Sequence, residues 1–126
     1  MQRYTPGQAA EKTGFSLDAL RYYERIGLLD NIARTAGGQR VFTADDLAWL
    51  GILRCLRDTG MPINRMIRYA ELARGGDETM AERTELLEAH DDSIERKIAD
   101  LRAEQRHIRE KIAWYRSAQS THAQQP

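Results

Sequence analysis

The sequence has one cysteine and no long apolar run, and each shortage excludes a class of protein or site. The one cysteine, Cys55, excludes an intramolecular disulfide and any zinc site that needs two thiolates. No apolar stretch approaches the roughly 20 residues that cross a bilayer, and the polar N-terminus has no signal-peptide core. We therefore expect a soluble, cytoplasmic protein that has no membrane partner.

The sequence also lacks the motifs of catalysis. It contains no glycine-rich phosphate loop, no nucleophile elbow and no paired-carboxylate pocket. Its histidines, His90, His107 and His122, do not have the spacing that gathers metal ligands, and solvated histidine is the expected state of each. The sequence predicts a protein that is not an enzyme and holds neither a cofactor nor a metal.

A net charge of zero conceals an uneven distribution of charge. Residues 1–74 contain eleven lysines and arginines against eight aspartates and glutamates, so the N-terminal part carries +3 and the remainder −3. A surplus of three is common on solvated surfaces. It does identify the N-terminal part as the side that would meet a polyanion.

Two short helices are expected near the N-terminus. Thr5 is suited to cap a first helix with Pro6 in its first turn, and Gly14 ends it. Ser16 is a natural N-cap for a second helix, whose apolar stripe includes Leu20. Two short helices joined at a glycine are typical of a helix-turn-helix.

A β-hairpin and two further helices are expected next. Gly37-Gly38 indicates a tight turn, and the alternating residues 39–42 after it predict a short strand, so this segment resembles a wing. Thr43 should cap a helix of about 15 residues. Pro62 then begins another helix that lasts to about Arg74.

A long amphipathic helix is predicted after Gly75-Gly76, because no glycine or proline follows until Pro126. One seam of a heptad repeat is Met80, Leu87, Ile94, Leu101, Ile108 and Tyr115. The second seam, partly polar, is Thr84, Asp91, Ile98, Gln105 and Ile112. A single helix cannot bury this stripe, so a second copy is the simplest partner. The expected dimer interface consists of Leu87, Ile94, Ile98, Leu101, Ile108 and Ile112.

Charges beside the seams favour an antiparallel dimer. With Ile98 opposite Leu101 of the second copy, Glu88 faces Arg109 and Glu95 faces Arg102, each pair occurring twice. Exposed pairs contribute only about 0.3 to 0.5 kcal/mol each, so they favour this orientation without proving it. The predicted organisation is a DNA-binding domain with linker helices at 1–74, a coiled coil at 77–117 and a disordered tail at 118–126.

The segment from Arg21 to Leu29, RYYERIGLL, holds the clearest candidates for nucleic-acid contacts. On a helix in the major groove, arginine and tyrosine side chains reach phosphates or base edges. Arg40 of the hairpin could reach the backbone or the minor groove. Two simpler readings remain open: one tyrosine is a core residue, and Arg40 is merely solvated. The candidates on the helix are Arg21, Tyr22, Tyr23 and Arg25.

The runs YTPGQAAEKTGFSLDALRYYERIGLL and GGQRVFTADDLAWL together resemble the MerR family of bacterial transcription regulators. The resemblance covers residues 3–74. It implies a mainly α protein, a winged helix-turn-helix dimer held by antiparallel C-terminal helices, bound to double-stranded promoter DNA that it twists so that RNA polymerase can initiate. It implies DNA contacts at Arg21, Tyr22, Tyr23 and Arg40, with Thr5 and Ser16 as caps close to the DNA backbone. Ala19 and Phe42 stand where the family often has threonine and tyrosine.

The effector is inferred from the part that follows the wing. Metal-sensing members of the family place several cysteines in or beyond the long helix, and none is present here. The segment LRCLRDTGMP resembles members whose lone cysteine responds to aldehydes, nitric oxide or disulfide stress, which makes Cys55 the candidate sensor. Arg54 and Arg57 should point away from it on an ideal helix. Two alternatives stay open: a structural Cys55 with a noncovalent effector or none, and a coiled-coil interaction protein that binds DNA without sequence preference.

Overall fold

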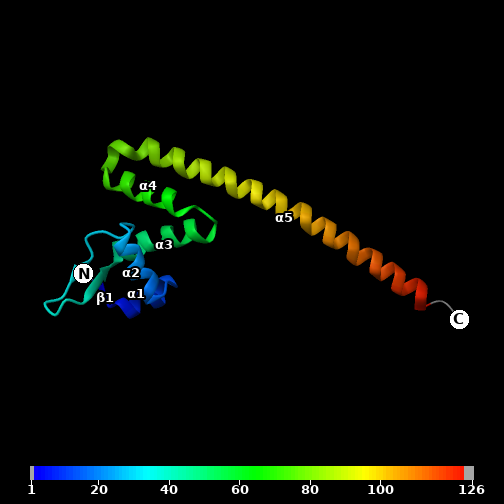
Figure 1. The fold of residues 1–126 in the computed structure, drawn as a ribbon, viewed down its shortest axis with the longest axis horizontal. Helices are drawn as coiled ribbons and strands as arrows, with labels where there is room; N and C mark the ends of the chain where they lie inside the picture. The colour runs from blue at the N-terminus through cyan, green and yellow to red at the C-terminus, as the bar shows by residue number, and fades with distance from the viewer. Residues whose placement is uncertain (1, 124–126) are drawn as a thin grey trace. The chain divides into compact units, whose positions relative to one another are not determined.

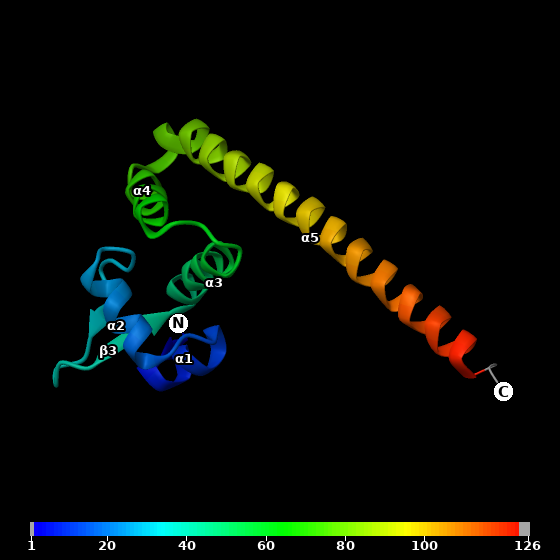
Figure 2. The ribbon, with the colours of Figure 1, turned by 45° about the vertical axis from the view of Figure 1, so that its right-hand side comes forward.

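A computed structural model describes residues 2–123 and is mainly helical, which confirms the predicted fold class (Figure 1). The chain divides into two compact units, Met1–Leu86 and Leu87–Pro126. In the first unit, α3 (Ala44–Asp58) packs against both α1 (Pro6–Thr13) and α4 (Ile63–Arg74) (Figure 2). This central helix connects the N-terminal elements to the linker helix.

Helix α1 and helix α2 (Leu17–Arg25) form the expected helix-turn-helix. The Thr5 hydroxyl accepts a hydrogen bond from the Gln8 amide, and the Ser16 hydroxyl accepts one from the Ala19 amide, so both predicted caps are confirmed. Helix α1 ends because Gly14 adopts a left-handed φ of 80° and its amide donates to the Ala10 carbonyl at 2.8 Å. The chain then turns directly into α2.

The wing belongs to a three-stranded antiparallel sheet in the order β1-β3-β2. Its strands are β1 (Arg3–Tyr4), β2 (Ala33–Arg34) and β3 (Arg40–Thr43). Gly38 sits in the turn with a φ of 87°, a conformation that glycine adopts without strain. The hairpin is therefore confirmed, and β1 is an additional strand, too short to show an alternating pattern in the sequence.

The core of the first unit fills the space between the sheet and helices α1 to α4. Thr43 and Asp46 form a reciprocal capping box that fixes the start of α3. Helix α3 then packs against strand β3 and against helices α1 and α4. The largest fully buried side chains are Phe42, Leu28, Leu50, Leu53 and Met66.

Helix α5 (Met80–Ala123) follows a short 3₁₀ turn, Gly76–Thr79. It continues beyond Ser117, so the predicted disordered tail is wrong for residues 118–123. No glycine or proline interrupts this segment, and the helix therefore propagates through it. The rest of the predicted tail, residues 124–126, lies outside the described residues. The first compact unit also extends past Gly75-Gly76, because Arg68 of α4 pairs with Glu82 of α5 at 3.3 Å.

Substituting Gly14 by alanine is expected to destabilise the first unit by about 1 to 3 kcal/mol. The residue would be strained at a φ of 80°, and its Cβ would overlap the guanidinium of Arg54, which donates to the Thr13 carbonyl at 2.6 Å. Urea unfolding measures the effect. The matched control is Gly51→Ala, inside α3 with open space around it, which should stabilise by about 0.5 to 1 kcal/mol. Equal effects of both substitutions would contradict the account.

Candidate nucleic-acid interface

Helix α2 has one face in the core and one face in solvent. Leu20 and Tyr23, three residues apart, are 2% and 5% exposed, and the Tyr23 ring packs edge-on against Phe15 at 5.2 Å. Arg21, Tyr22 and Arg25 are exposed on the other side. Two core side chains thus fix the rotation of the helix and present a basic, aromatic surface.

The structure separates the two tyrosines. Tyr23 was predicted as a DNA contact, but it is a core side chain, because its position on the apolar stripe buries it against Phe15. Tyr22 is 42% exposed and lies under the guanidinium of Arg25 at 5.5 Å from the ring centre. The reading in which one tyrosine belongs to the core is therefore correct for Tyr23.

Arg21 stays available to a ligand although it forms an ion pair. Its guanidinium lies 3.1 Å from the Asp18 carboxylate one turn earlier, and both side chains are well exposed. An exposed pair of this kind contributes roughly 0 to 1 kcal/mol. A phosphate group could therefore replace the Asp18 carboxylate at little cost.

Arg40 is held to helix α2 rather than left free in the wing. Its Nε lies 2.5 Å from Glu24 Oε1, and Arg34 of β2 pairs with the same oxygen at 3.4 Å. Glu24 thus joins α2 to both strands of the hairpin. The sequence does not predict this role, because a single glutamate on a helix does not reveal a partner sixteen residues away.

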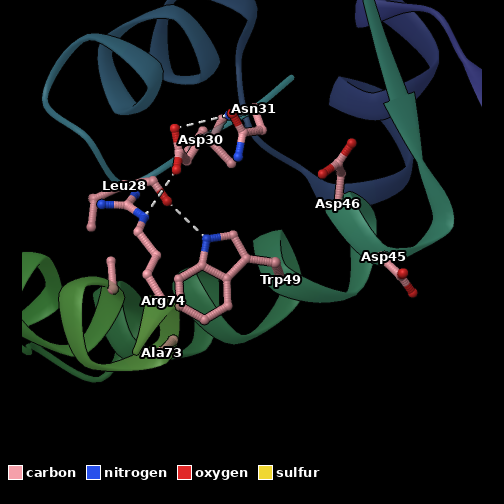
Figure 3. A pocket seen from close by; sticks show the side chains of 10 residues that line it. Leu28, Asp30, Asn31, Asp45, Asp46, Trp49, Ala73 and Arg74 are labelled. Atoms are coloured by element: carbon pink, nitrogen blue, oxygen red, sulfur yellow. Dashed lines mark hydrogen bonds and ion pairs between the residues drawn. The ribbon is translucent and has the colours of Figure 1, made fainter. Parts of the chain in front are cut away.

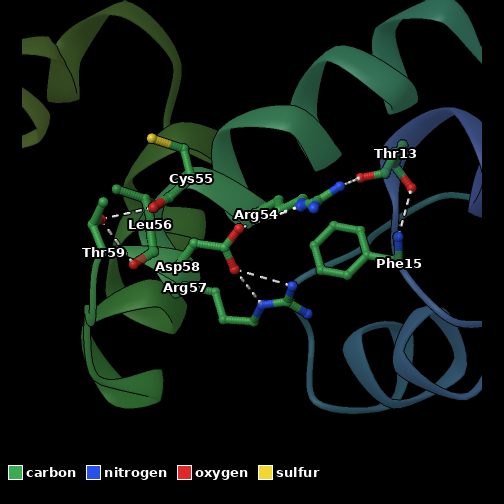
Figure 4. Close-up of polar contacts among 8 residues, drawn as sticks. All are labelled: Thr13, Phe15, Arg54, Cys55, Leu56, Arg57, Asp58 and Thr59. Atoms are coloured by element: carbon green, nitrogen blue, oxygen red, sulfur yellow. Dashed lines mark hydrogen bonds and ion pairs between the residues drawn. The ribbon is translucent and has the colours of Figure 1, made fainter.

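Cys55 lies on the solvent side of α3. Its side chain is exposed, while Leu53 and Leu56 on either side of it are buried. Cys55 is not a core side chain, because the apolar stripe of α3 passes through Leu50, Leu53 and Leu56 and leaves position 55 outside. The sulfur atom is directed away from the neighbouring charged side chains (Figure 4).

The two arginines beside Cys55 in the sequence are engaged elsewhere. Arg54 donates to the Thr13 carbonyl at 2.6 Å, and Arg57 covers the Phe15 ring at 4.7 Å (Figure 4). Hydrogen bonds from Arg57 and Arg54 hold the pKa of the Asp58 carboxyl below its usual range, against a smaller opposing effect of burial. The prediction that both arginines point away from the thiol is confirmed.

Two kinds of site are absent from residues 2–123. No helix in this range is long and apolar enough to span a bilayer. Nor do three or more His, Cys, Asp or Glu side chains of this range converge on a position where they could hold a metal ion. The exposed face of α2 and the adjoining wing remain the principal candidate for a binding surface.

Comparisons with known proteins agree with this arrangement. Residues 4–72 match the model of the MerR HTH family regulatory proteins, and residues 47–111 match the model described as MerR, DNA binding. An uncharacterised HTH-type transcriptional regulator of Haemophilus influenzae is 40% identical over 117 residues, which is 93% of this chain and 87% of that protein. AdhR of Bacillus subtilis is 35% identical over 80 residues, 64% of this chain and 57% of AdhR.

Solved structures extend the likeness to the long helix. HiNmlR, described as a MerR family regulator lacking the sensor domain and bound to promoter DNA, is 39% identical, covers 94% of each chain and has a TM-score of 0.85. A putative regulator from Listeria monocytogenes is 37% identical, covers 89% of this chain and 85% of its own, and has a TM-score of 0.84. These regulators are not enzymes. The chain belongs to the MerR family of helix-turn-helix, DNA-binding transcription regulators.

Proposed function

We propose that this regulator acts in the cytoplasm as a homodimer that binds double-stranded promoter DNA and distorts it, so that RNA polymerase initiates in response to a thiol-reactive signal. The observation that carries the DNA-binding part is the exposed face of α2, with Arg21, Tyr22 and Arg25 beside a wing joined to it through Glu24. A rigid helix and a rigid hairpin presented together suit a major groove and its adjacent backbone.

The caps extend this surface. Thr5 and Ser16 are exposed at the N-termini of α1 and α2, where backbone amides favour a phosphate oxygen. Arg40 contributes by holding the wing, and its half-buried guanidinium could turn from Glu24 to a phosphate. The proposed contacts are Arg21, Tyr22 and Arg25, supported by Thr5, Ser16 and Arg40.

The dimer is supported by the apolar surface of α5. Leu101 and Ile108 are 65% and 59% exposed, and Ile98 and Ile112 on the second seam are 38% and 43% exposed. Leu87 and Ile94 continue the first seam towards the start of the helix. A stripe of this length is stable in water only when a second helix covers it, and the charge pattern favours an antiparallel copy.

Promoter binding is supported by likeness to a relative, and distortion is the expected consequence of a dimer that carries two recognition helices. HiNmlR was crystallised on promoter DNA, and its likeness to this chain extends through 94% of both proteins. Two recognition helices held at fixed spacing read two half-sites and constrain the DNA between them. A change in their spacing would alter the promoter that RNA polymerase meets.

Signal sensing is assigned to Cys55. Cys55 is the single cysteine and its thiol is exposed on α3, which packs against α1 and α4. An adduct there could shift α3 against its neighbours and so reorient the DNA-binding elements. Alternatively, Cys55 is structural and the effector binds noncovalently.

Replacing Cys55 by alanine is expected to abolish induction of the target promoter by formaldehyde or a nitric oxide donor. Because the side chain is exposed, the free energy of unfolding should change by less than about 0.5 kcal/mol. A reporter fused to the promoter measures induction. The control is Thr59→Ala, which removes a hydroxyl group at the C-terminal end of α3 and leaves the thiol in place. Unchanged induction in the Cys55→Ala strain would rule out the thiol as the sensor.

A further inference from the structure

A cavity of about 280 Å³ lies between α3, α4 and the segment that follows the recognition helix (Figure 3). Its apolar wall comes from Leu28, Leu29, Ala70 and Ala73. The two alanines lie on one face of α4 and leave space that larger side chains would fill. The volume of this cavity is near the lower limit of ligand-binding pockets, so it suits a small molecule that contains a single ring.

Trp49 is held in a fixed orientation in this cavity. Its indole N–H donates to the Leu28 carbonyl at 2.8 Å, and its ring stacks on Tyr69 of α4 with centroids 5.4 Å apart and planes at 9°. The side chain is half-buried and lines the cavity. A ring fixed before binding loses no rotamer freedom to a ligand.

Of the three carboxylates that line the cavity near the Trp49 ring, one is neutralised by an ion pair within the described part of the chain and two are not. Asp30 pairs with Arg74 at 3.4 Å, whereas neither Asp45 nor Asp46 forms an ion pair with any side chain of residues 2–123. Asp46 accepts a hydrogen bond from the Thr43 amide at 2.9 Å, and Asp45 is exposed. In Figure 3, these two aspartates lie on one side of Trp49 and Arg74 lies on the other.

We propose that this cavity binds a small organic cation, an ammonium group carried on an aromatic or alkyl body. The body would rest against the alanine and leucine wall and the indole of Trp49. The ammonium group would lie beside Asp45 and Asp46, attracted by their carboxylates and by the electron-rich ring. A neutral molecule would lack that attraction, and an anion would be repelled by the same carboxylates.

A ligand in this cavity would lie next to the contacts that hold the C-terminal end of the recognition helix, α2. The Leu28 carbonyl that holds Trp49 follows α2, and the adjacent Gly27 carbonyl accepts a hydrogen bond from Arg74 at the end of α4. A bound cation would contact Trp49 and Arg74, the two side chains that donate these hydrogen bonds, and would change how α3 and α4 hold the end of α2. This regulatory consequence rests on the proposed function, whereas binding itself does not.

Tryptophan fluorescence of the full chain tests binding directly. In a Trp114→Phe variant, Trp49 is the sole tryptophan and reports on the cavity. Phenethylammonium is expected to change its emission saturably, with one site per chain and a Kd on the order of 1 mM or tighter. The isosteric probes 2-phenylethanol and 3-phenylpropionate should bind at least about tenfold more weakly. Equal affinity for the three probes, or no saturable change, would overturn the proposal.

Three variants locate the site. Asp45→Asn should weaken phenethylammonium about fivefold, the effect of one partly exposed charge, whereas Asp92→Asn on α5 should leave its affinity unchanged. Ala73→Met should fill the cavity and abolish saturable binding, with thermal unfolding confirming that the variant is folded. Unaltered affinity in Asp45→Asn would contradict the site. Failure of DNA binding with the cation still bound would refute the proposed function alone.

Discussion

Replacing Leu101 by aspartate is expected to convert the protein from a dimer into a monomer and to weaken binding to a palindromic operator at least about a hundredfold. Leu101 is 65% exposed in the single chain, and in the antiparallel register it lies against Ile98 of the second copy. The substitution removes two large apolar contacts per dimer and places two carboxylates in the seam, each site costing about 2 to 5 kcal/mol.

The matched control for this substitution is Ala103→Asp. Residue 103 lies on the same helix but on the face opposite the seam, so the added charge and the helix propensity are comparable. Light scattering after size-exclusion chromatography should give a dimer for the control and a monomer for Leu101→Asp. A dimer in both variants would place the interface somewhere other than α5.

Replacing Arg21 by alanine is expected to weaken operator binding by about 2 to 6 kcal/mol, because each dimer presents the residue twice and each lost contact costs about 1 to 3 kcal/mol. The fold should be unaffected, since within residues 2–123 the side chain of Arg21 pairs only with the exposed carboxylate of Asp18. Fluorescence anisotropy with labelled operator DNA measures the loss.

The salt dependence of binding then identifies what Arg21 contacts. If it reaches phosphates, the slope of log K against log salt should fall by about two, one for each copy; if it reaches base edges, discrimination between operator and random DNA should fall instead. Arg65→Ala, an exposed arginine on α4 outside the proposed surface, is the control. Equal losses in both variants would mean that only overall charge matters.

The helices could be predicted because their signals are local. Thr5, Ser16 and Thr43 each cap a helix within three residues of sequence, and Gly14 ends one by its own φ. The heptad repeat likewise lies in one continuous segment. Such features need no knowledge of distant contacts, and the three caps, the end of α1 at Gly14 and the continuous helix α5 are found in the structure.

The pairing that stabilises the wing could not be predicted in this way. Glu24 meets Arg40 only after the hairpin folds back against α2, and β1 pairs with β3 across nearly forty residues. Neither contact leaves a periodic trace in the sequence. Long-range ion pairs and two-residue strands are set by tertiary packing, which local propensity does not report.

The burial of Tyr23 and the exposure of Cys55 both follow from the spacing of apolar residues in the sequence. Tyr23 lies three residues after Leu20, which places it on the buried stripe of α2, while Tyr22 falls off that stripe. Cys55 similarly falls between Leu53 and Leu56 and off the stripe of α3. The same spacing rule predicts a buried Tyr23 and an exposed Cys55, as the structure has them.

The most direct test of the account is a footprint of the protein on the DNA upstream of its own gene, together with the affinity for that DNA and for random DNA at the same salt concentration. We predict protection of two symmetric half-sites, altered cleavage between them, and a preference of at least about a thousandfold. Uniform, weak protection with comparable affinity for random DNA would contradict the account and indicate an interaction protein that binds DNA without sequence preference.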